Sequence, residues 1–276
     1  MESIRQAVER TKGHANGSSN RQSRISDNFP QHELELGAPE YIPGGHCQET
    51  VLDSTYLQSK RIISHLIADR RSRSFDMLRT QVLQSMDLQG WKTLAVTSPT
   101  PSCGKTVTAL NLALSIARQP ERSVLLVDLD FRKPHVATSL GLTCDDGVLG
   151  VLEGRKALSE AIIPAGVDDL RFMVLPTAST LRSSEWNSSL AMTAMLKNIV
   201  KEHHSKTIIL DLPPILLGDD TIAILPQIDC VLLVAAVGTT TLAQIKESSK
   251  HLQSTEVVRI VLNKVPETSA DHYYRY

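Results

Sequence analysis

The sequence predicts an α/β fold in which a doubly wound, mostly parallel sheet carries helices on both faces. Three observations predict it: short apolar runs alternate with helical patterns, a Gly-Lys-Thr turn joins one run to a helix, and acidic residues end two of the runs. Runs rich in Val, Ile and Leu, without polar alternation, are typical of strands buried on both faces of a parallel sheet.

Six apolar runs are predicted strands: Thr93–Thr97, Val124–Asp128, Leu170–Pro176, Thr207–Asp211, Cys230–Ala236 and Arg259–Leu262. Helical patterns are predicted at Thr106–Arg118, Trp186–His203, Asp219–Leu225 and Leu242–Leu252. Ahead of them, Phe75, Leu78 and Val82 recur at helical spacing, which predicts a helix over Ser74–Leu88. Ligands of doubly wound sheets bind at the carboxyl ends of the strands, so the polar residues there are the candidates for function.

Composition divides the 276 residues into three parts. Residues 1–55 are polar and poor in branched apolar residues, so we expect them to be largely disordered. Residues 56–265 carry the α/β pattern and are the predicted main domain. Residues 266–276 form a predicted flexible tail that bears tyrosines.

Charge, cysteine content and hydropathy exclude several classes of function. The net charge is −1 without a long basic block, which argues against nucleic acid as a partner. The four cysteines form no C-x-x-C pair, which argues against zinc and indicates a reducing compartment. The longest apolar run, Ile228 to Val237, is about half of the ~20 residues that a membrane span needs, so we expect no direct membrane insertion. We expect a cytoplasmic protein whose attachment to a membrane comes only through a partner.

The Gly-Lys-Thr turn lies in LAVTSPTPSCGKT, residues 94–106, and a helical pattern follows it. This strand–loop–helix context is the one that a phosphate-binding P-loop requires. Backbone N–H groups of such a loop and of the helix N-terminus point at an anion. Lys105 is expected to reach the β- and γ-phosphates, and the Thr106 hydroxyl to bind Mg²⁺. The candidate nucleotide-binding residues of the loop are Ser102, Cys103, Gly104, Lys105, Thr106 and Val107.

Two acidic strand ends accompany the loop. LLVDLDFRKP places Asp128 and Asp130 after one predicted strand, and IILDLPP places Asp211 after another. Carboxylates with phosphate oxygens and water are the ligands that Mg²⁺ prefers, so Asp128 and Asp211 are candidate metal ligands. Asp130 could bind the metal or accept a proton from an attacking hydroxyl, and Arg132 could neutralise phosphate charge. The alternative for the first cluster is a loop ion pair. Together the three motifs predict a fold of the P-loop NTPase type that binds a nucleoside triphosphate.

Two further patterns leave their function open at this point. Arg73, Asp76 and Arg79 share one face of a predicted helix, which fits a solvated face with a local ion pair or a subunit contact. The tail contains Tyr273, Tyr274 and Tyr276, three of the five tyrosines of the chain. Tyrosines in a mobile tail do not serve core packing, and beside a nucleotide site they are candidate phosphoacceptors.

The motifs SPTPSCGKT, LLVDLDFRKP and IILDLPP, with the tyrosine tail, resemble the bacterial tyrosine kinases (BY-kinases). These are the cytoplasmic autokinases of capsule and exopolysaccharide assembly. The resemblance implies catalysis by Lys105, Asp128, Asp130 and Asp211, and Mg-ATP held by Gly104, Lys105 and Thr106 with the carboxylates. It implies phosphorylation of the tail in trans within a homo-oligomeric ring. It also implies two partners: a membrane chain-length regulator (polysaccharide co-polymerase), which recruits the kinase to the inner face of the plasma membrane, and a cognate tyrosine phosphatase.

The sequence departs from the family in two places, and two other functions stay open. Ser102-Cys103 stands where the family usually has Gly-Glu, and the charges at 73 and 76 are exchanged relative to the family's ring contact. The loop departure favours a weakly active pseudokinase, a nucleotide-binding adaptor. A Min/Par-type ATPase switch shares the fold, but it carries a second lysine where Thr100 stands.

Overall fold

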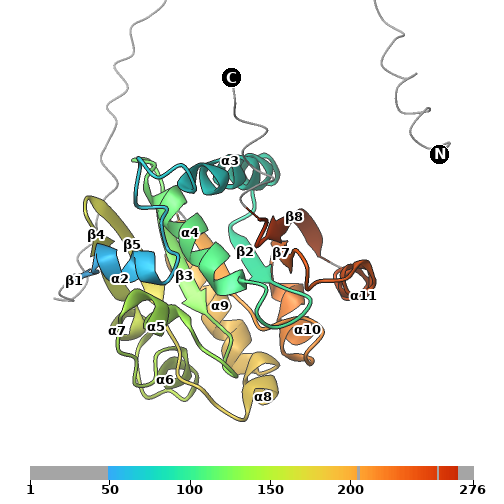
Figure 1. The fold of residues 1–276 in the computed structure, drawn as a ribbon. Helices are drawn as coiled ribbons and strands as arrows, with labels where there is room; N and C mark the ends of the chain where they lie inside the picture. Colours follow the sequence, from blue (N-terminus) through green and yellow to red (C-terminus); the bar gives the residue numbers. More distant parts are fainter. Residues whose placement is uncertain (1–48, 204–205, 254, 267–276) are drawn as a thin grey trace, which may run out of the picture. The chain divides into compact units, whose positions relative to one another are not determined.

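The computed structural model describes residues 49–203, 206–253 and 255–266, and within them it forms one eight-stranded sheet in the order β1-β4-β5-β3-β6-β2-β7-β8 (Figure 1). The strands are β1 (Thr50–Val51), β2 (Thr93–Thr97), β3 (Ser123–Asp128), β4 (Ile163–Val167), β5 (Leu170–Leu175), β6 (Lys206–Asp211), β7 (Cys230–Ala236) and β8 (Glu256–Asn263). Every neighbouring pair is parallel except the β4–β5 hairpin. The predicted fold class is therefore confirmed.

Helices cover both faces of this sheet and create two separate cores. Their bounds are α2 (Ser54–Ser59), α3 (Ser72–Gln89), α4 (Lys105–Ala117), α5 (Val136–Leu140), α6 (Val148–Leu152), α7 (Leu158–Ala161), α8 (Ser183–Asn187), α9 (Leu190–Glu202), α10 (Asp220–Ile224), the 3₁₀ turn η1 (Leu225–Gln227) and α11 (Leu242–His251). On one face α2, α3, α4 and α5 contribute apolar side chains to the core, and on the other α6, α9 and α10 do so. All residues of β2 and β7 are buried, because strands in the middle of a doubly covered sheet have no solvent side.

Local sequence explains where the structure differs from the predicted elements. The helix predicted at Trp186–His203 is two helices, α8 and α9, since the Ser189 hydroxyl caps α9 by accepting from the Met192 N–H at 3.0 Å. The strand β4 was not predicted because its sequence, IPAGV, contains Pro and Gly and lacks a continuous apolar run. β1 and α2 lie around the predicted domain boundary at residue 56, and the three-part division of the chain stays a prediction.

The buried side chain of Asn111 attaches the segment before α3 to the middle of α4. Its Oδ1 accepts hydrogen bonds from the Ile63 N–H at 2.8 Å and the Ser64 N–H at 3.0 Å, and its Nδ2 donates to the Arg61 carbonyl at 3.0 Å. A buried backbone N–H without a partner is costly, so one amide side chain here satisfies a connection that has no strand or helix of its own.

Replacement of Asn111 by Ala should lower the free energy of unfolding by about 3 kcal/mol, because it leaves two buried N–H groups without an acceptor. Urea denaturation measures the change. Asn198→Ala, at an exposed position of α9, is the matched control and should change stability by about 0.5 kcal/mol or less. Equal effects of the two substitutions would contradict this role of Asn111.

Candidate active site

The strand order brings the three predicted motifs to one edge of the sheet. β6 lies between β2 and β3, and Asp211 at its end is in register with Val96 of β2 and with Asp128 of β3. The loop after β2 leads into α4 at Lys105. Residues that are 106 positions apart in sequence thus become neighbours at the carboxyl ends of adjacent parallel strands.

The loop before α4 has the backbone of an anion-binding turn. Gly104 precedes the helix at φ +91°, and a Cβ at this position would come within 2.2 Å of the Asn263 amide nitrogen. The conformation therefore favours glycine, and a larger residue would also displace the Asn263 side chain. Ser102 adopts φ +63°, the left-handed conformation that favours glycine, although it carries a side chain. Lys105, Thr106 and Val107 open the helix, so their N–H groups lack intrahelical acceptors and are available to an anion.

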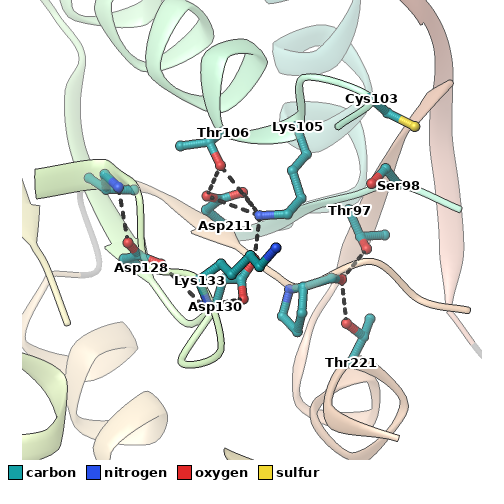
Figure 2. Close-up of polar contacts among 12 residues, drawn as sticks. Thr97, Ser98, Cys103, Lys105, Thr106, Asp128, Asp130, Lys133, Asp211 and Thr221 are labelled. Atoms are coloured by element: carbon teal, nitrogen blue, oxygen red, sulfur yellow. Dashed lines mark hydrogen bonds and ion pairs between the residues drawn. The ribbon is translucent and has the colours of Figure 1, made fainter. Parts of the chain in front are cut away.

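The Lys105 ammonium is the centre of the polar cluster (Figure 2). It lies 2.8 Å from Asp130 Oδ2 and 3.4 Å from Asp211 Oδ1. The Thr106 hydroxyl donates to the other oxygen of Asp211 at 2.6 Å. All of these side chains are buried, which strengthens their electrostatic interactions relative to a surface site.

Asp128 lies beside this cluster, and within the described residues its carboxylate accepts hydrogen bonds from backbone N–H groups alone. Its two oxygens accept from the N–H groups of Asp130 and Val136, each at 3.1 Å. The Asp130 carboxylate in turn accepts from the Lys133 N–H at 3.1 Å. These bonds hold the loop after β3 so that both carboxylates remain at the end of the sheet.

Burial and mutual repulsion shift the protonation of these groups. Burial, with the nearby charge of Asp211, raises the pKa of Asp128 to about 8. Burial also raises the pKa of Asp211, although Lys105 and the Thr106 hydrogen bond oppose the shift. For Lys105 burial disfavours the ammonium, but the charges of Asp211 and Asp130 outweigh it and the pKa is raised above its usual value. Three carboxylates thus share one ammonium, and the cluster lacks positive charge.

The residues present fit a Mg²⁺ ion that is held partly by a nucleotide. Among the described residues no group of three or more His, Cys, Asp or Glu side chains converges as a complete metal site. Mg²⁺ typically takes one or two protein carboxylates and completes its coordination with phosphate oxygens and water. Asp211 with the Thr106 hydroxyl offers such a partial set, and Asp128 is the carboxylate next to it.

Two predicted binding residues have other partners in the structure. Arg132 is directed to α10 and α8, where it pairs with Asp220 at 2.7 Å and donates to Ser183 Oγ at 3.2 Å. The Cys103 sulfur points away from the Lys105 ammonium (Figure 2) and lies 3.4 Å from Thr240 Oγ1. Burial opposes ionisation of this thiol, but hydrogen bonds with Thr240 and Thr100 outweigh burial and lower its pKa. Binding by Cys103 is therefore left to its backbone N–H, and the roles of all the predicted site residues stay predictions.

Three residues around the site were not predicted as part of it. Asn263, at the end of β8, donates to the Cys103 carbonyl at 2.9 Å and so braces the loop. Thr97 and Thr221 each donate to the Pro213 carbonyl at 2.7 Å, which ties the end of β2 to the segment after β6. The two prolines after Asp211-Leu212 are a sequence signal for a segment without strand partners. No sequence signal indicates that Asn263 contacts the loop.

The face formed by Arg73, Asp76 and Arg79 is partly engaged within the chain. Asp76 accepts from Arg118 Nη1 of α4 at 2.9 Å and lies 3.3 Å from Arg79 Nη1. Arg79 also donates to the Ser115 carbonyl at 2.9 Å. Arg73 is exposed. These contacts fasten α3 to α4, and they leave the choice between a local ion pair and a subunit contact untested.

Comparison with known proteins decides the family. A model described as the CobQ/CobB/MinD/ParA nucleotide binding domain matches residues 94–275, more than half of the chain. The chain belongs to the CobQ/CobB/MinD/ParA family of nucleotide-binding domains. Among the described residues, no helix has the length and apolar character of a membrane-crossing segment.

Within this family the chain is similar to tyrosine kinases. It is 28% identical over 229 residues to the putative tyrosine-protein kinase EpsB of Ralstonia nicotianae, which covers 81% of the chain and 29% of that relative. It is 29% identical over 212 residues to the tyrosine-protein kinase YwqD of Bacillus subtilis, which covers 74% of the chain and 86% of YwqD. The recognition of the bacterial tyrosine kinase family from the motifs is confirmed. The chain spans less than a third of the length of EpsB.

Solved kinase domains have the same fold. The VpsO kinase domain is 26% identical with a TM-score of 0.62, over 71% of the chain and 97% of that domain. The kinase domain of the Escherichia coli tyrosine kinase ETK is 23% identical with a TM-score of 0.68, over 79% of the chain and 90% of that domain. At 23% identity, the similarity to the ETK kinase domain is evidence for the fold alone.

Replacement of Ser102 by Gly should leave the free energy of unfolding unchanged or raise it by up to about 1 kcal/mol. A left-handed residue with a side chain costs roughly 1–2 kcal/mol, which is partly offset by the extra unfolded-state entropy of glycine. Ser102→Val should be destabilising, because β-branched residues tolerate this conformation poorly. Urea denaturation of both variants is the measurement, and a Gly variant less stable than the Val variant would contradict the assignment of strain.

The raised pKa of Asp128 predicts a pH dependence of stability without metal. Its folded pKa of about 8 exceeds the unfolded value, so its stabilising contribution is present below the unfolded pKa and is lost as the pH rises toward 8. In EDTA the free energy of unfolding of the wild type should fall between about pH 4 and pH 8 more steeply than that of Asp128→Asn. Asp169→Asn, at an exposed position, is the control and should keep the wild-type slope. Parallel slopes for all three proteins would refute the prediction.

Proposed function

We propose that the chain is an ATP-dependent protein-tyrosine autokinase that phosphorylates its C-terminal tyrosines and regulates capsule or exopolysaccharide synthesis and export. The observation that carries the proposal is the position of Asp130. Its carboxylate lies 2.8 Å from the Lys105 ammonium, in a family of nucleotide-binding domains and beside two further carboxylates. The names of the tyrosine-kinase relatives support the transfer to tyrosine.

Each residue of the site has a role in this chemistry. Thr106, Asp128 and Asp211 would hold Mg²⁺, which when bound neutralises phosphate charge and orients the phosphate oxygens. Ser102 to Val107 would bind the phosphates of ATP through their N–H groups, with Lys105 on the β- and γ-phosphates. Phosphoryl transfer needs little covalent help, so these residues act by positioning and by charge.

Asp130 is the candidate for the proton of the tyrosine hydroxyl. In the structure it is paired with Lys105, which also contacts Asp211. Phosphate oxygens compete for the same ammonium, so nucleotide binding would weaken the Lys105–Asp130 pair. The released carboxylate could then accept a hydrogen bond from the incoming tyrosine hydroxyl. During transfer it could accept the proton of that hydroxyl. Without nucleotide, the Asp130 carboxylate stays paired with the Lys105 ammonium.

The acceptor tyrosines Tyr273, Tyr274 and Tyr276 lie outside the described residues, and their assignment rests on sequence. β8 is the strand that precedes them in the chain, and its Asn263 contacts the nucleotide loop at 2.9 Å. Phosphorylation in trans within a homo-oligomer, recruitment by a membrane polysaccharide co-polymerase and reversal by a cognate phosphatase belong to the same proposal. The similarity to EpsB and to the Salmonella tyrosine-protein kinase wzc supports a connection with polysaccharide export.

The two alternatives, a nucleotide-binding adaptor and a Min/Par-type ATPase switch, have less support than the kinase. Ser102 keeps the left-handed backbone that favours glycine, so the serine does not by itself abolish an anion-binding loop. Thr100, at the position of the second Min/Par lysine, lies against the Cys103 sulfur and cannot supply a cation.

Mass spectrometry after incubation with Mg-ATP, mapping phosphate by residue, tests the proposal. Lys105→Met should lower tail phosphotyrosine by at least roughly 100-fold, since positioned charges typically contribute factors of this size. Asp130→Asn should lower transfer by about 10²–10⁴-fold and ATP affinity far less. Lys197→Met, an exposed lysine of α9, is the matched control and should phosphorylate like the wild type.

Phosphotyrosine that is unchanged in both site variants would remove the assignment. A tail that stays unmodified in the wild type, despite ATP binding and the addition of the membrane partner's cytoplasmic segment, would favour the adaptor function instead.

A further inference from the structure

β8 is an unprotected edge strand. It is the last strand at one side of the sheet, and no strand of the described part of the chain lies beyond it. Edge strands present unpaired N–H and C=O groups, which proteins usually protect by short length, proline or charge. β8 has eight residues, contains no proline, and between its first and last residues carries only one charge, Arg259, which turns to Gln81 of α3 at 3.2 Å.

One face of this strand is also apolar and exposed. Val257, Ile260 and Leu262 are 37%, 48% and 62% exposed. Their register partners on β7 are Val231, Leu233 and Ala235, so all three side chains lie on one face of the sheet. Helix α11 packs Ile245 on the core of that face, yet it leaves these strand residues uncovered.

Some backbone N–H and C=O groups of β8 point to the open edge of the sheet. The Val237 N–H donates to the Asn263 carbonyl at 2.9 Å, so the backbone groups of Asn263 face β7. Backbone direction alternates along a strand, so Arg259 and Val261 also face β7. Ile260 and Leu262 therefore direct their N–H and C=O groups to the open edge. Ile260 and Leu262 are the two most exposed apolar residues of β8, and within the described part of the chain their backbone groups have no neighbouring strand to pair with.

We propose that β8 is a homodimer interface in which two copies pair their β8 strands antiparallel about a two-fold axis at Val261. In this register Ile260 lies opposite Leu262 of the partner subunit, and the pair occurs twice. The outward N–H and C=O groups of these residues exchange the hydrogen bonds of an antiparallel ladder. Arg259 lies opposite Asn263 of the partner subunit, so no like charges meet. The strand is self-complementary, which is the condition for an isologous two-fold contact.

The paired residues Ile260 and Leu262 are not among the residues proposed to act in phosphoryl transfer. The carboxyl end of each β8 lies at its own nucleotide loop, through the Asn263 contact with the Cys103 carbonyl. In this register Asn263 lies two residues from the axis, so the carboxyl ends of the two paired strands lie four residues, roughly 14 Å, apart along the strand direction. The interface goes beyond the proposed kinase function and does not depend on it.

Sedimentation velocity of the full chain without nucleotide, over a range of concentrations, tests the interface. The wild type should form a concentration-dependent dimer. The double variant Ile260→Lys, Leu262→Lys should dissociate at least about tenfold more readily, because buried lysines at a pairing edge oppose association. Leu88→Lys, at an 82% exposed position of α3, is the control and should dimerise like the wild type. Circular dichroism and thermal melting establish that the variants are folded.

A cysteine pair tests the register. The axis at Val261 brings its two copies together in a non-hydrogen-bonded pair with Cα atoms about 4.5 Å apart, within the range of a disulfide. With Cys47 and Cys144 replaced by Ser, Val261→Cys should form a disulfide-linked dimer under mild oxidation. Glu256→Cys, at the other end of β8, should not, because its two copies lie far apart in this register.

Three results would overturn the proposal. One is a wild type that is monomeric at every concentration, as expected if the edge accepts an extended segment of another protein. The second is a dimer that the double lysine variant leaves intact. The third is Val261→Cys that cross-links no better than Glu256→Cys.

Discussion

The sharing of one ammonium among three buried carboxylates is the interaction on which the arrangement of the site depends. Lys105 contacts Asp130 and Asp211 directly, and Asp128 lies beside them with only backbone donors. An unpaired buried charge is costly, so a site with too little positive charge either binds protons or binds a cation. The raised pKa of Asp128 is the first response. A Mg²⁺ ion that arrives with nucleotide phosphates is the second, and the same phosphates supply a new partner for Lys105.

The sheet makes this concentration of charge tolerable. β6 lies between β2 and β3, and all three strands are almost wholly buried, so their ends are held at fixed spacing. Asn263 fixes the loop before α4 from the side of β8, and Thr97 fixes the segment after Asp211. The site is therefore built on rigid strand ends with loops that are tied at their backbone, which is the condition for catalysis by positioning.

Much of this could be predicted from sequence, because the informative signals are local. The six apolar runs predict β2, β3, β5, β6, β7 and β8, and the glycine before Lys105 marks the start of α4. The features that the sequence did not predict depend on distant contacts. β4 contains Pro164 and Gly166 and becomes a strand only by pairing with β5. The ion pair of Arg132 with the buried Asp220, more than eighty residues away, was not visible in the sequence either. Asn263 gives no sign in the sequence that it braces the loop 160 residues earlier.

The most direct test of the charge-deficient site is calorimetry of Mg-ATP binding near pH 7 in buffers of different ionisation enthalpy, which reports the protons released. Metal ligands must be deprotonated, and Asp128 has a pKa of about 8, so binding should release protons from the wild type. The release should be smaller in Asp128→Asn, which has no carboxyl proton to lose there. Binding that releases no protons, or an equal release by both proteins, would contradict a Mg-nucleotide site built on these carboxylates.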